Sequence, residues 1–291
     1  MPELPEVEVT RQRIGPLLVG RRIRSVATTR PSYLFLTRPA ALRRGLVGRT
    51  VRALERRGKY LVAPLDDGAR LVIHLGMTGQ LFSGEATSPR LLSASARSAL
   101  PPEDQAGFRP DGHTHLRLAF EDRGPEVFLR DVRKFGKVLL LGSGESHERL
   151  DRLGVDALEL SGAALFAASR GRRAAAKALL LDQSVATGIG NIYADEALFR
   201  ARLRPTRRAG SLSRRDCDAL AEAVRAVLRR SIETGGSSIR DYVAPDGSDG
   251  AYQDERRVYG RKGAECLVCG ARIRRVLVAQ RSTHYCPACQ R

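Results

Sequence analysis

Four cysteines near the end of the chain have the spacing of a metal site. Cys266 and Cys269 form one Cys-x2-Cys pair, Cys286 and Cys289 form another, and sixteen residues separate the pairs. Four thiolates carried on two tight turns can surround one tetrahedral zinc ion, and a closed site of this kind stabilises a fold and does not catalyse a reaction. The alternative is four buried thiols without a metal. The spacing favours one structural zinc ion.

The segment between the two cysteine pairs is basic. Its cationic or titratable residues are Arg272, Arg274, Arg275, Arg281 and His284. A hairpin stiffened by zinc would present these side chains as a basic finger that can enter a groove or contact phosphates.

The first residues, MPELPEVEVT, carry prolines and carboxylates where chain ends are usually frayed. Pro5 suits the first turn of a helix, and Glu6 and Glu8 complement the positive end of the helix dipole. Neither argument accounts for Pro2 or Glu3.

Several further residues could serve chemistry or structure. In GIGN, Gly188 and Gly190 allow a close backbone approach, and a helix N-terminus after them could bind a phosphate, although two glycines can also form an ordinary turn. Lys59 in RRGKYLV could be a solvated lysine. His74 could equally be a satisfied structural histidine, Met77 a core residue, and Arg133 and Phe135 part of an ordinary strand end.

Composition and charge limit the possible partners. The 291 residues are 42% hydrophobic, which is enough to bury the cores of about two globular domains. The formal charge of +18 favours a polyanion partner, most commonly nucleic acid. No apolar run approaches the roughly 18 residues of a membrane span, and the N-terminus lacks signal-peptide features. We therefore expect a cytoplasmic protein that does not bind a membrane.

The residue patterns predict an α+β fold. Residues 1–140 alternate apolar and polar side chains around turns such as Asp66-Asp67-Gly68, which predicts antiparallel sheets after a first helix over about 5–18. Residues 83–112 are rich in Ser, Ala, Pro and Gly and predict a long, partly mobile surface loop.

The period becomes helical after about residue 150. Asn191 is predicted to cap a helix whose first turn carries Asp195 and Glu196, and Ser213 with Asp216 is predicted to cap the next helix. Cys217 has the helical spacing of a core residue.

The motifs together resemble one family. In order along the chain they are MPELPEVE, RRGKYLV, IHLGMTGQL, DVRKFGK, LLDQSVATGIGNIYADEAL, VYGRKG and QRSTHYC with the paired cysteines. This sequence resembles bacterial formamidopyrimidine-DNA glycosylase, of the Fpg/Nei family, over nearly the whole chain except the loop at 83–112.

The resemblance implies three domains: an N-terminal catalytic β-sandwich over 1–140, a helical helix-two-turns-helix DNA-binding domain over 141–245, and a zinc-finger hairpin over 246–291. It implies a monomeric, bifunctional glycosylase and AP lyase of base excision repair that removes 8-oxoguanine and formamidopyrimidines from duplex DNA bound in a basic cleft.

The resemblance also implies residue roles. After removal of Met1, Pro2 would be the nucleophile, Glu3 the proton donor at the sugar, Lys59 the donor for β-elimination and Arg281 the donor for δ-elimination. The implied DNA contacts, including a wedge of Met77, Arg133 and Phe135, are His74, Met77, His113, Arg133, Phe135, Arg173, Lys177, Asn191 and Tyr259.

The chain departs from the family pattern in places. The loop before His113 is longer than usual, Lys134 replaces an arginine, His284 replaces an aromatic residue, and Ala176 replaces a larger apolar residue. Two alternatives are an endonuclease VIII-like glycosylase for oxidised pyrimidines and a non-catalytic zinc-finger DNA-binding protein. The ELPEVE continuation favours the purine enzyme over the first, and intact Pro2, Glu3 and Lys59 argue against the second.

Overall fold

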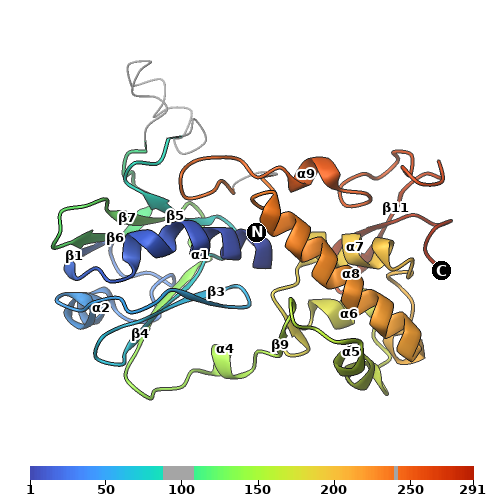
Figure 1. Cartoon of the computed structure of the whole chain (residues 1–291), viewed down its shortest axis with the longest axis horizontal. Coiled ribbons are helices and arrows are strands. Elements are labelled where there is room, and N and C mark those ends of the chain that lie inside the picture. The colour runs from blue at the N-terminus through green and yellow to red at the C-terminus, as the bar shows by residue number, and fades with distance from the viewer. Residues whose placement is uncertain (88–107, 239–241) are drawn as a thin grey trace. The chain divides into compact units, whose positions relative to one another are not determined.

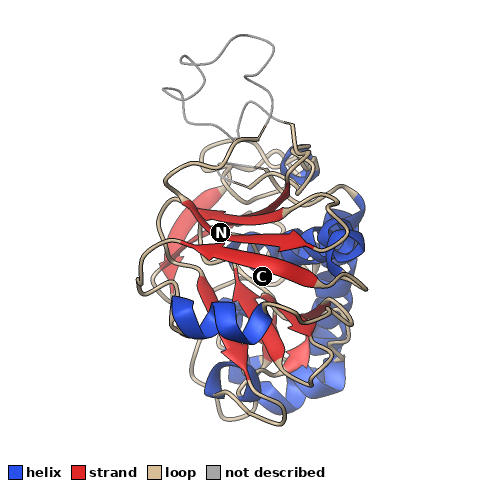
Figure 2. Ribbon diagram, turned by 90° about the vertical axis from the view of Figure 1, so that its left-hand side faces the viewer, coloured by secondary structure: helices blue, strands red, loops and turns tan. Residues whose placement is uncertain are grey.

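The computed structural model describes residues 1–87, 108–238 and 242–291, whose helices and strands are drawn in Figures 1 and 2. The chain forms two compact units. The first unit contains residues 1–147 and 234–251, and the second contains 148–233 and 252–291. The division into three domains expected from the sequence stays a prediction. Most of the predicted loop at 83–112, namely 88–107, lies outside the described residues.

The first unit contains two four-stranded sheets. The first sheet has the order β1-β6-β7-β5 and the second β2-β3-β4-β8, with antiparallel pairing throughout. Its helices and strands are α1 (Leu4–Leu18), β1 (Ile23–Thr28), α2 (Pro39–Leu46), β2 (Glu55–Arg57), β3 (Tyr60–Pro64), β4 (Arg70–His74), β5 (Gly79–Ser83), β6 (Thr114–Phe120), β7 (Val127–Asp131) and β8 (Lys137–Leu141).

The core of the first unit lies between these sheets and α1. Alternate residues of each strand point inward, so Leu61 and Ile73 of the second sheet join Leu118 and Leu129 of the first in one buried cluster. Ile14 of α1 is fully buried in the same cluster. The predicted antiparallel sandwich and first helix are confirmed.

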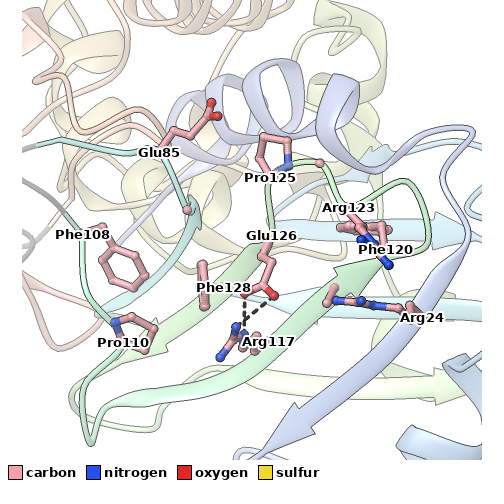
Figure 3. A pocket seen from close by; sticks show the side chains of 13 residues that line it. Arg24, Glu85, Phe108, Pro110, Arg117, Phe120, Arg123, Pro125, Glu126 and Phe128 are labelled. Atoms are coloured by element: carbon pink, nitrogen blue, oxygen red, sulfur yellow. Dashed lines mark hydrogen bonds and ion pairs between the residues drawn. The ribbon is translucent and has the colours of Figure 1, made fainter.

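The opposite face of the first sheet carries a cavity of about 840 Å³ (Figure 3). Arg117 and Phe128 line it because they alternate with core residues along β6 and β7. Arg117 forms an ion pair with Glu126, which also lines the cavity. None of the predicted site residues lines this cavity.

The second unit combines short helices with a C-terminal hairpin. The long helix α8 begins after Ser213, whose Oγ accepts the Asp216 N–H while the Asp216 carboxylate accepts the Ser213 N–H, so this predicted cap is confirmed. Cys217 is fully buried, as expected. The elements are α4 (Glu148–Asp151), β9 (Val155–Asp156), α5 (Gly162–Ser169), α6 (Ala176–Leu181), β10 (Ala186–Thr187), α7 (Asn191–Arg200), η3 (Ala209–Ser211), α8 (Arg214–Glu233), α9 (Tyr252–Glu255), β11 (Arg274–Val278) and β12 (Arg281–Tyr285).

The predicted cap of α7 is wrong. Gly190 occupies the N-cap, and Asn191 is the first helical residue and makes no side-chain cap. Asp195 and Glu196 therefore lie in the second turn, where both are buried. They do not neutralise the helix end.

Among the residues that the structure describes, no helix has both the length and the apolar character needed to cross a membrane.

Candidate functional site

Pro2 and Glu3 are buried at the beginning of α1. The Glu3 N–H donates to Glu6 Oε2 over 2.8 Å, and Ser237 N–H donates to the other Glu6 oxygen over 2.9 Å. Glu6 is itself 1% exposed. One buried carboxylate therefore fixes the first turn of α1 against the segment that follows α8, and the two predicted catalytic residues at the chain start have a defined position.

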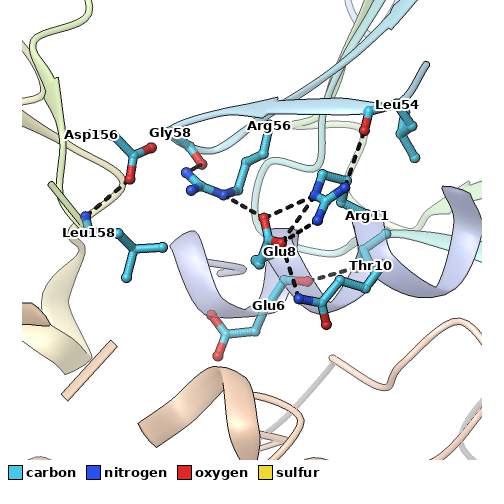
Figure 4. Close-up of polar contacts among 10 residues, drawn as sticks. Glu6, Glu8, Thr10, Arg11, Leu54, Arg56, Gly58, Asp156 and Leu158 are labelled. Atoms are coloured by element: carbon cyan, nitrogen blue, oxygen red, sulfur yellow. Dashed lines mark hydrogen bonds and ion pairs between the residues drawn. The ribbon is translucent and has the colours of Figure 1, made fainter. Parts of the chain in front are cut away.

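Lys59 is buried in the turn between β2 and β3, and an ion pair connects this turn to α1. Arg56 Nε donates to Glu8 Oε2 over 2.9 Å, and Arg56 Nη1 donates to the Gly58 carbonyl over 3.3 Å (Figure 4). Arg11 also binds Glu8. Burial of Glu8 opposes ionisation, but hydrogen bonds and charge from Arg11 and Arg56 prevail, so the pKa of Glu8 is lowered.

The structure brings the predicted wedge residues together. Met77 lies in the turn between β4 and β5, while Arg133 and Phe135 lie in the loop between β7 and β8, and all three are exposed. The guanidinium of Arg133 stacks 4.5 Å from the centre of the Phe135 ring. A Cβ on Gly76 would lie 2.4 Å from the Gly136 nitrogen, so the two loops touch through their backbones.

His74 ends β4 and has a defined tautomer. Its Nδ1 accepts the Gly76 N–H over 3.1 Å, so the neutral ring carries its proton on Nε2 and can donate from that atom. His113 is held through its backbone, because its N–H donates to Asp111 Oδ1 and its carbonyl accepts the Asp131 N–H, each over 2.9 Å.

In the second unit, a buried carboxylate positions Tyr259. Both oxygens of Glu196 on α7 accept backbone N–H groups, over 2.8 Å from Arg257 and Tyr259 and 3.0 Å from Val258. Burial raises the pKa of Glu196, while these three donors act in the opposite direction. Asn191, half-buried, lies at the start of the same helix.

Arg281 begins β12 directly after the tip of the C-terminal hairpin and is exposed. The tip residues Ala279 and Gln280 have φ of 48° and 59°, the left-handed conformation that a two-residue hairpin turn requires. Arg173, on the segment before α6, is also exposed.

Lys177 corrects the sequence-based expectation, because its side chain is not placed as a DNA contact. It is fully buried, and its Nζ lies 2.6 Å from Asp195 Oδ1. The same Nζ donates to the Ser282 carbonyl and to Thr283 Oγ1. Since an isolated buried ammonium is costly, the lysine holds Asp195 and strand β12 and does not face a polyanion.

Asp195 connects α7 to the same strand. Its Oδ2 accepts the His284 N–H over 2.8 Å, and the His284 ring lies edge-on to Tyr259 with centroids 5.3 Å apart. The position where the family often has an aromatic residue is thus occupied here by a buried histidine tied to α7.

The four predicted metal ligands form one cluster. The cysteine Sγ atoms all lie within 4.8 Å of one another, with separations of 3.4 Å for Cys269 to both Cys286 and Cys289 and 3.9 Å for Cys266 to Cys289. Tetrahedral zinc with bonds of about 2.3 Å requires sulfur atoms about 3.8 Å apart. The cluster fits one such ion.

The residues that position these side chains are Glu6, Glu8, Arg56, Thr78, Asp131, Asp195 and Glu196. The sequence motifs predict this positioning role for none of them, although Glu6, Glu8, Asp195 and Glu196 were expected near helix ends. Their sequence signal is weak, because a carboxylate that binds backbone N–H groups has no fixed spacing from its donors. Asp131, at a strand end followed by a loop with Gly136, offered the clearest signal.

Family profiles match three parts of the chain. Residues 1–138 match the formamidopyrimidine-DNA glycosylase N-terminal domain, 153–243 the formamidopyrimidine-DNA glycosylase H2TH domain, and 263–291 the zinc finger found in FPG and IleRS. The last match contains all four cysteines, so the chain has a zinc finger with one structural zinc ion.

Known proteins are similar over the full length. Formamidopyrimidine-DNA glycosylases of Geobacter sulfurreducens and Halorhodospira halophila are 42% and 45% identical, with 100% of each chain covered. The MutM (Fpg) structure from Thermus thermophilus is 39% identical with a TM-score of 0.82 and covers 99% of this chain and 98% of that one. A complex of a Lactococcus lactis FPG mutant with Fapy-dG containing DNA has a TM-score of 0.84 at 34% identity, with both chains fully covered.

We predict that Glu8→Gln destabilises the first unit by about 1 to 3 kcal/mol at pH 7, because Arg56 and Arg11 lose a charged partner. A carboxyl group with a lowered folded-state pKa stabilises the fold above its ordinary value of 4.5, and this contribution is lost as the pH falls through the folded-state pKa. The difference between variant and wild type should therefore shrink below about pH 4.5. Denaturant unfolding at several pH values measures it, and Glu55→Gln, at an exposed position of β2, is the control.

We predict that Lys177→Met destabilises the second unit by about 3 to 5 kcal/mol, because it leaves Asp195 charged and buried without the lysine. Thermal unfolding of the zinc-loaded protein measures the loss, and Lys262→Met, at an exposed position, should change stability by less than about 0.5 kcal/mol. A Lys177→Met protein as stable as the Lys262 variant would contradict the buried-pair interpretation.

Proposed function

Because this chain belongs to the formamidopyrimidine-DNA glycosylase family, we propose that Pro2 is the nucleophile with which it acts on damaged DNA. The chain is a DNA glycosylase and AP lyase that removes oxidised purines, 8-oxoguanine and formamidopyrimidines, from duplex DNA. It works as a monomer, and its formal charge of +18 supports binding to the phosphate backbone. We place it in the bacterial cytoplasm, at the nucleoid.

The reaction begins when removal of Met1 frees the Pro2 nitrogen. An N-terminal amine has an ordinary pKa of about 7.7 to 8.0, so a useful fraction is unprotonated at neutral pH. The nitrogen attacks C1′ of the damaged nucleoside and the C1′–base bond breaks; the nitrogen loses its proton and the departing base gains one. The C1′–O4′ bond then opens, O4′ takes a proton from Glu3, and C1′ becomes doubly bonded to the proline nitrogen. Because the proline nitrogen is secondary, the resulting Schiff base is a cationic iminium, which acidifies the C2′ proton. Loss of that proton expels the 3′ phosphate, and a second elimination expels the 5′ phosphate.

Three further residues take part in proton transfer in this proposal. Glu3 protonates the sugar ring, Lys59 serves β-elimination and Arg281 serves δ-elimination. His74, Asn191 and Tyr259 bind phosphates beside the lesion, and the Nε2–H of His74 suits a phosphate oxygen.

Other exposed groups contact the duplex around the flipped nucleotide. Met77, Arg133 and Phe135 fill the space that it leaves, which offsets a stacking loss of a few kcal/mol. His113 and Arg173 make further DNA contacts.

The observation that carries the proposal is the connection between α1 and the Lys59 turn. Glu6 fixes the backbone at Glu3, and the Glu8–Arg56 ion pair joins α1 to the turn that carries Lys59. Buried or half-buried charged residues thus hold both the chain start with Glu3 and the turn with Lys59 in place within the first unit. Such prior ordering supports a nucleophile that must meet its substrate in one geometry.

We predict that borohydride traps a covalent adduct between Pro2 and a duplex containing 8-oxoguanine, because borohydride reduces the iminium to a stable amine. Mass spectrometry of the digested adduct should place DNA on the N-terminal peptide. Pro2→Gly should lower the trapped yield at least about tenfold, because the proline nitrogen and its ring geometry are lost.

The matched control is Pro39→Gly, at the start of α2, which should trap like the wild type. Equal and slow nicking of an abasic duplex by wild type and Pro2→Gly would favour the non-catalytic zinc-finger alternative. Preferential cleavage of an oxidised pyrimidine at equal concentration would favour the endonuclease VIII-like alternative.

We predict that chelation of zinc abolishes DNA binding while the β-sandwich stays folded. The ion joins the two ends of the basic hairpin, so its loss releases the strand that carries Arg281. Fluorescence anisotropy with a duplex containing an abasic-site analogue measures binding, and near-UV circular dichroism with hydrogen exchange measures folding. Recovery after zinc is added back is the control, and tight binding by the metal-free protein would refute the prediction.

A further inference from the structure

Asp131 ends strand β7 as a fully buried carboxylate whose two oxygens both accept hydrogen bonds. Oδ2 accepts the Gly136 N–H over 2.8 Å. Oδ1 accepts the Thr78 hydroxyl over 2.5 Å and the Arg133 N–H over 3.2 Å. One carboxylate therefore binds both loops that carry Met77, Arg133 and Phe135.

Thr78 connects these two loops a second time. Its hydroxyl donates to Asp131 and accepts the Arg133 N–H over 3.1 Å, and its side chain is 6% exposed. A hydroxyl can donate and accept at the same time. Thr78, which directly follows Met77, therefore links the Met77 loop to the backbone of Arg133.

The backbone of Asp131 holds a third segment. Its N–H donates to the His113 carbonyl, and its carbonyl accepts a hydrogen bond of 3.0 Å from Nε2 of the buried His115. Burial lowers the pKa of His115, which agrees with a neutral ring that donates from Nε2. The short segment with His113 is thus tied to the same strand end.

We propose that Asp131 and Thr78 are positioning residues that hold the tips of Met77, Arg133 and Phe135 in one arrangement before DNA binds. The proposal rests on the function proposed above and adds two residues that do not themselves touch DNA. All three tips are exposed, while Asp131 and Thr78, which bind both loops, are buried.

Sterics explain why the loops must be held as a pair. A Cβ on Gly76 would lie 2.4 Å from the Gly136 nitrogen and 2.5 Å from the Phe135 carbonyl carbon, so only glycine fits at position 76 and the two loop backbones lie in close contact. Lys134 between the wedge residues has φ of 57°, which costs energy for a residue other than glycine. Hydrogen bonds from both sides to one carboxylate keep this strained turn in place.

The chemistry of a carboxylate explains why the residue is an aspartate. The site offers two N–H donors and one hydroxyl, and an ionised carboxylate is an acceptor at both oxygens. Asparagine has the same shape, but its NH2 group would face one of these donors. Asp131→Asn should therefore release one loop without leaving a cavity.

The expected defect depends on how firmly the lesion is stacked. Ordering a loop residue costs about 1 to 2 kcal/mol in conformational entropy. If the loops are already ordered in the free protein, this cost does not weaken the insertion of Met77, Arg133 and Phe135 into DNA. Flipping a paired nucleotide costs a few kcal/mol, and least for a nucleotide whose base is missing. Loosened loops should thus impair excision of a paired lesion more than cleavage at a preformed abasic site.

The experiment compares kcat/KM on two duplexes, one with 8-oxoguanine opposite dC and one with a preformed abasic site. Thr78→Val and Asp131→Asn should each lower the first value about tenfold, corresponding to about 1.4 kcal/mol, and the second less than about twofold. Thr78→Ser retains the hydroxyl and should restore the wild-type ratio. Ser83→Ala removes a hydroxyl that accepts a backbone N–H at the other end of β5 and should leave the ratio unchanged.

The outcomes separate the inference from the function on which it rests. If the wild type cleaves neither duplex, the proposed function fails. If the wild type is active and the variants lose equal activity on both duplexes, or none, the positioning role is wrong. Should Asp131→Asn not fold, Thr78→Val and Thr78→Ser decide the question, since both keep the carboxylate and its bond to Gly136.

Discussion

Buried carboxylates that accept backbone N–H groups are the constraint on which the predicted site depends. Glu6 holds the start of α1, Asp131 holds the loop with Arg133 and Phe135, and Glu196 holds the segment with Tyr259. Asp195 does the same for strand β12 at His284. If one of these loops moved away, its buried carboxylate would lose hydrogen bonds and the fold would be destabilised. Each carboxylate therefore stabilises its loop in one position.

This arrangement separates acids from bases in a strongly basic chain. Acids that order the loops face inward, whereas Arg133, Arg173 and Arg281 are exposed, so the surface keeps its cations available for phosphates. Some basic residues lie inside: Lys59 and Arg130 are buried, and Lys177 is fully buried and neutralises Asp195. A basic residue in a family motif can thus be part of the interior, and only burial and partners distinguish an interior role from a DNA contact.

The sequence predicted the elements and the chemistry better than it predicted their supports. Strand alternation, the Ser213 cap and the cysteine spacing each depend on local patterns, and each is confirmed by the structure. The cap at Asn191 was wrong because Gly190 can occupy the N-cap itself. The links from Glu8 to Arg56 and from Thr78 to Asp131 join residues about fifty positions apart, and their hydrogen bonds form only once the strands pair.

Backbone strain occurs beside two of the predicted DNA-binding tips. Lys134 lies between Arg133 and Phe135, and Ala279 with Gln280 precedes Arg281; all three tip residues have positive φ without being glycine. Glycine would relieve this strain, but it would also widen the range of conformations open to each tip. In both places hydrogen bonds that anchor the flanking strands hold the strained turn, to Asp131 in one case and between β11 and β12 in the other. The folded scaffold therefore offsets the strain energy of these turns, and each tip is already ordered before it binds DNA.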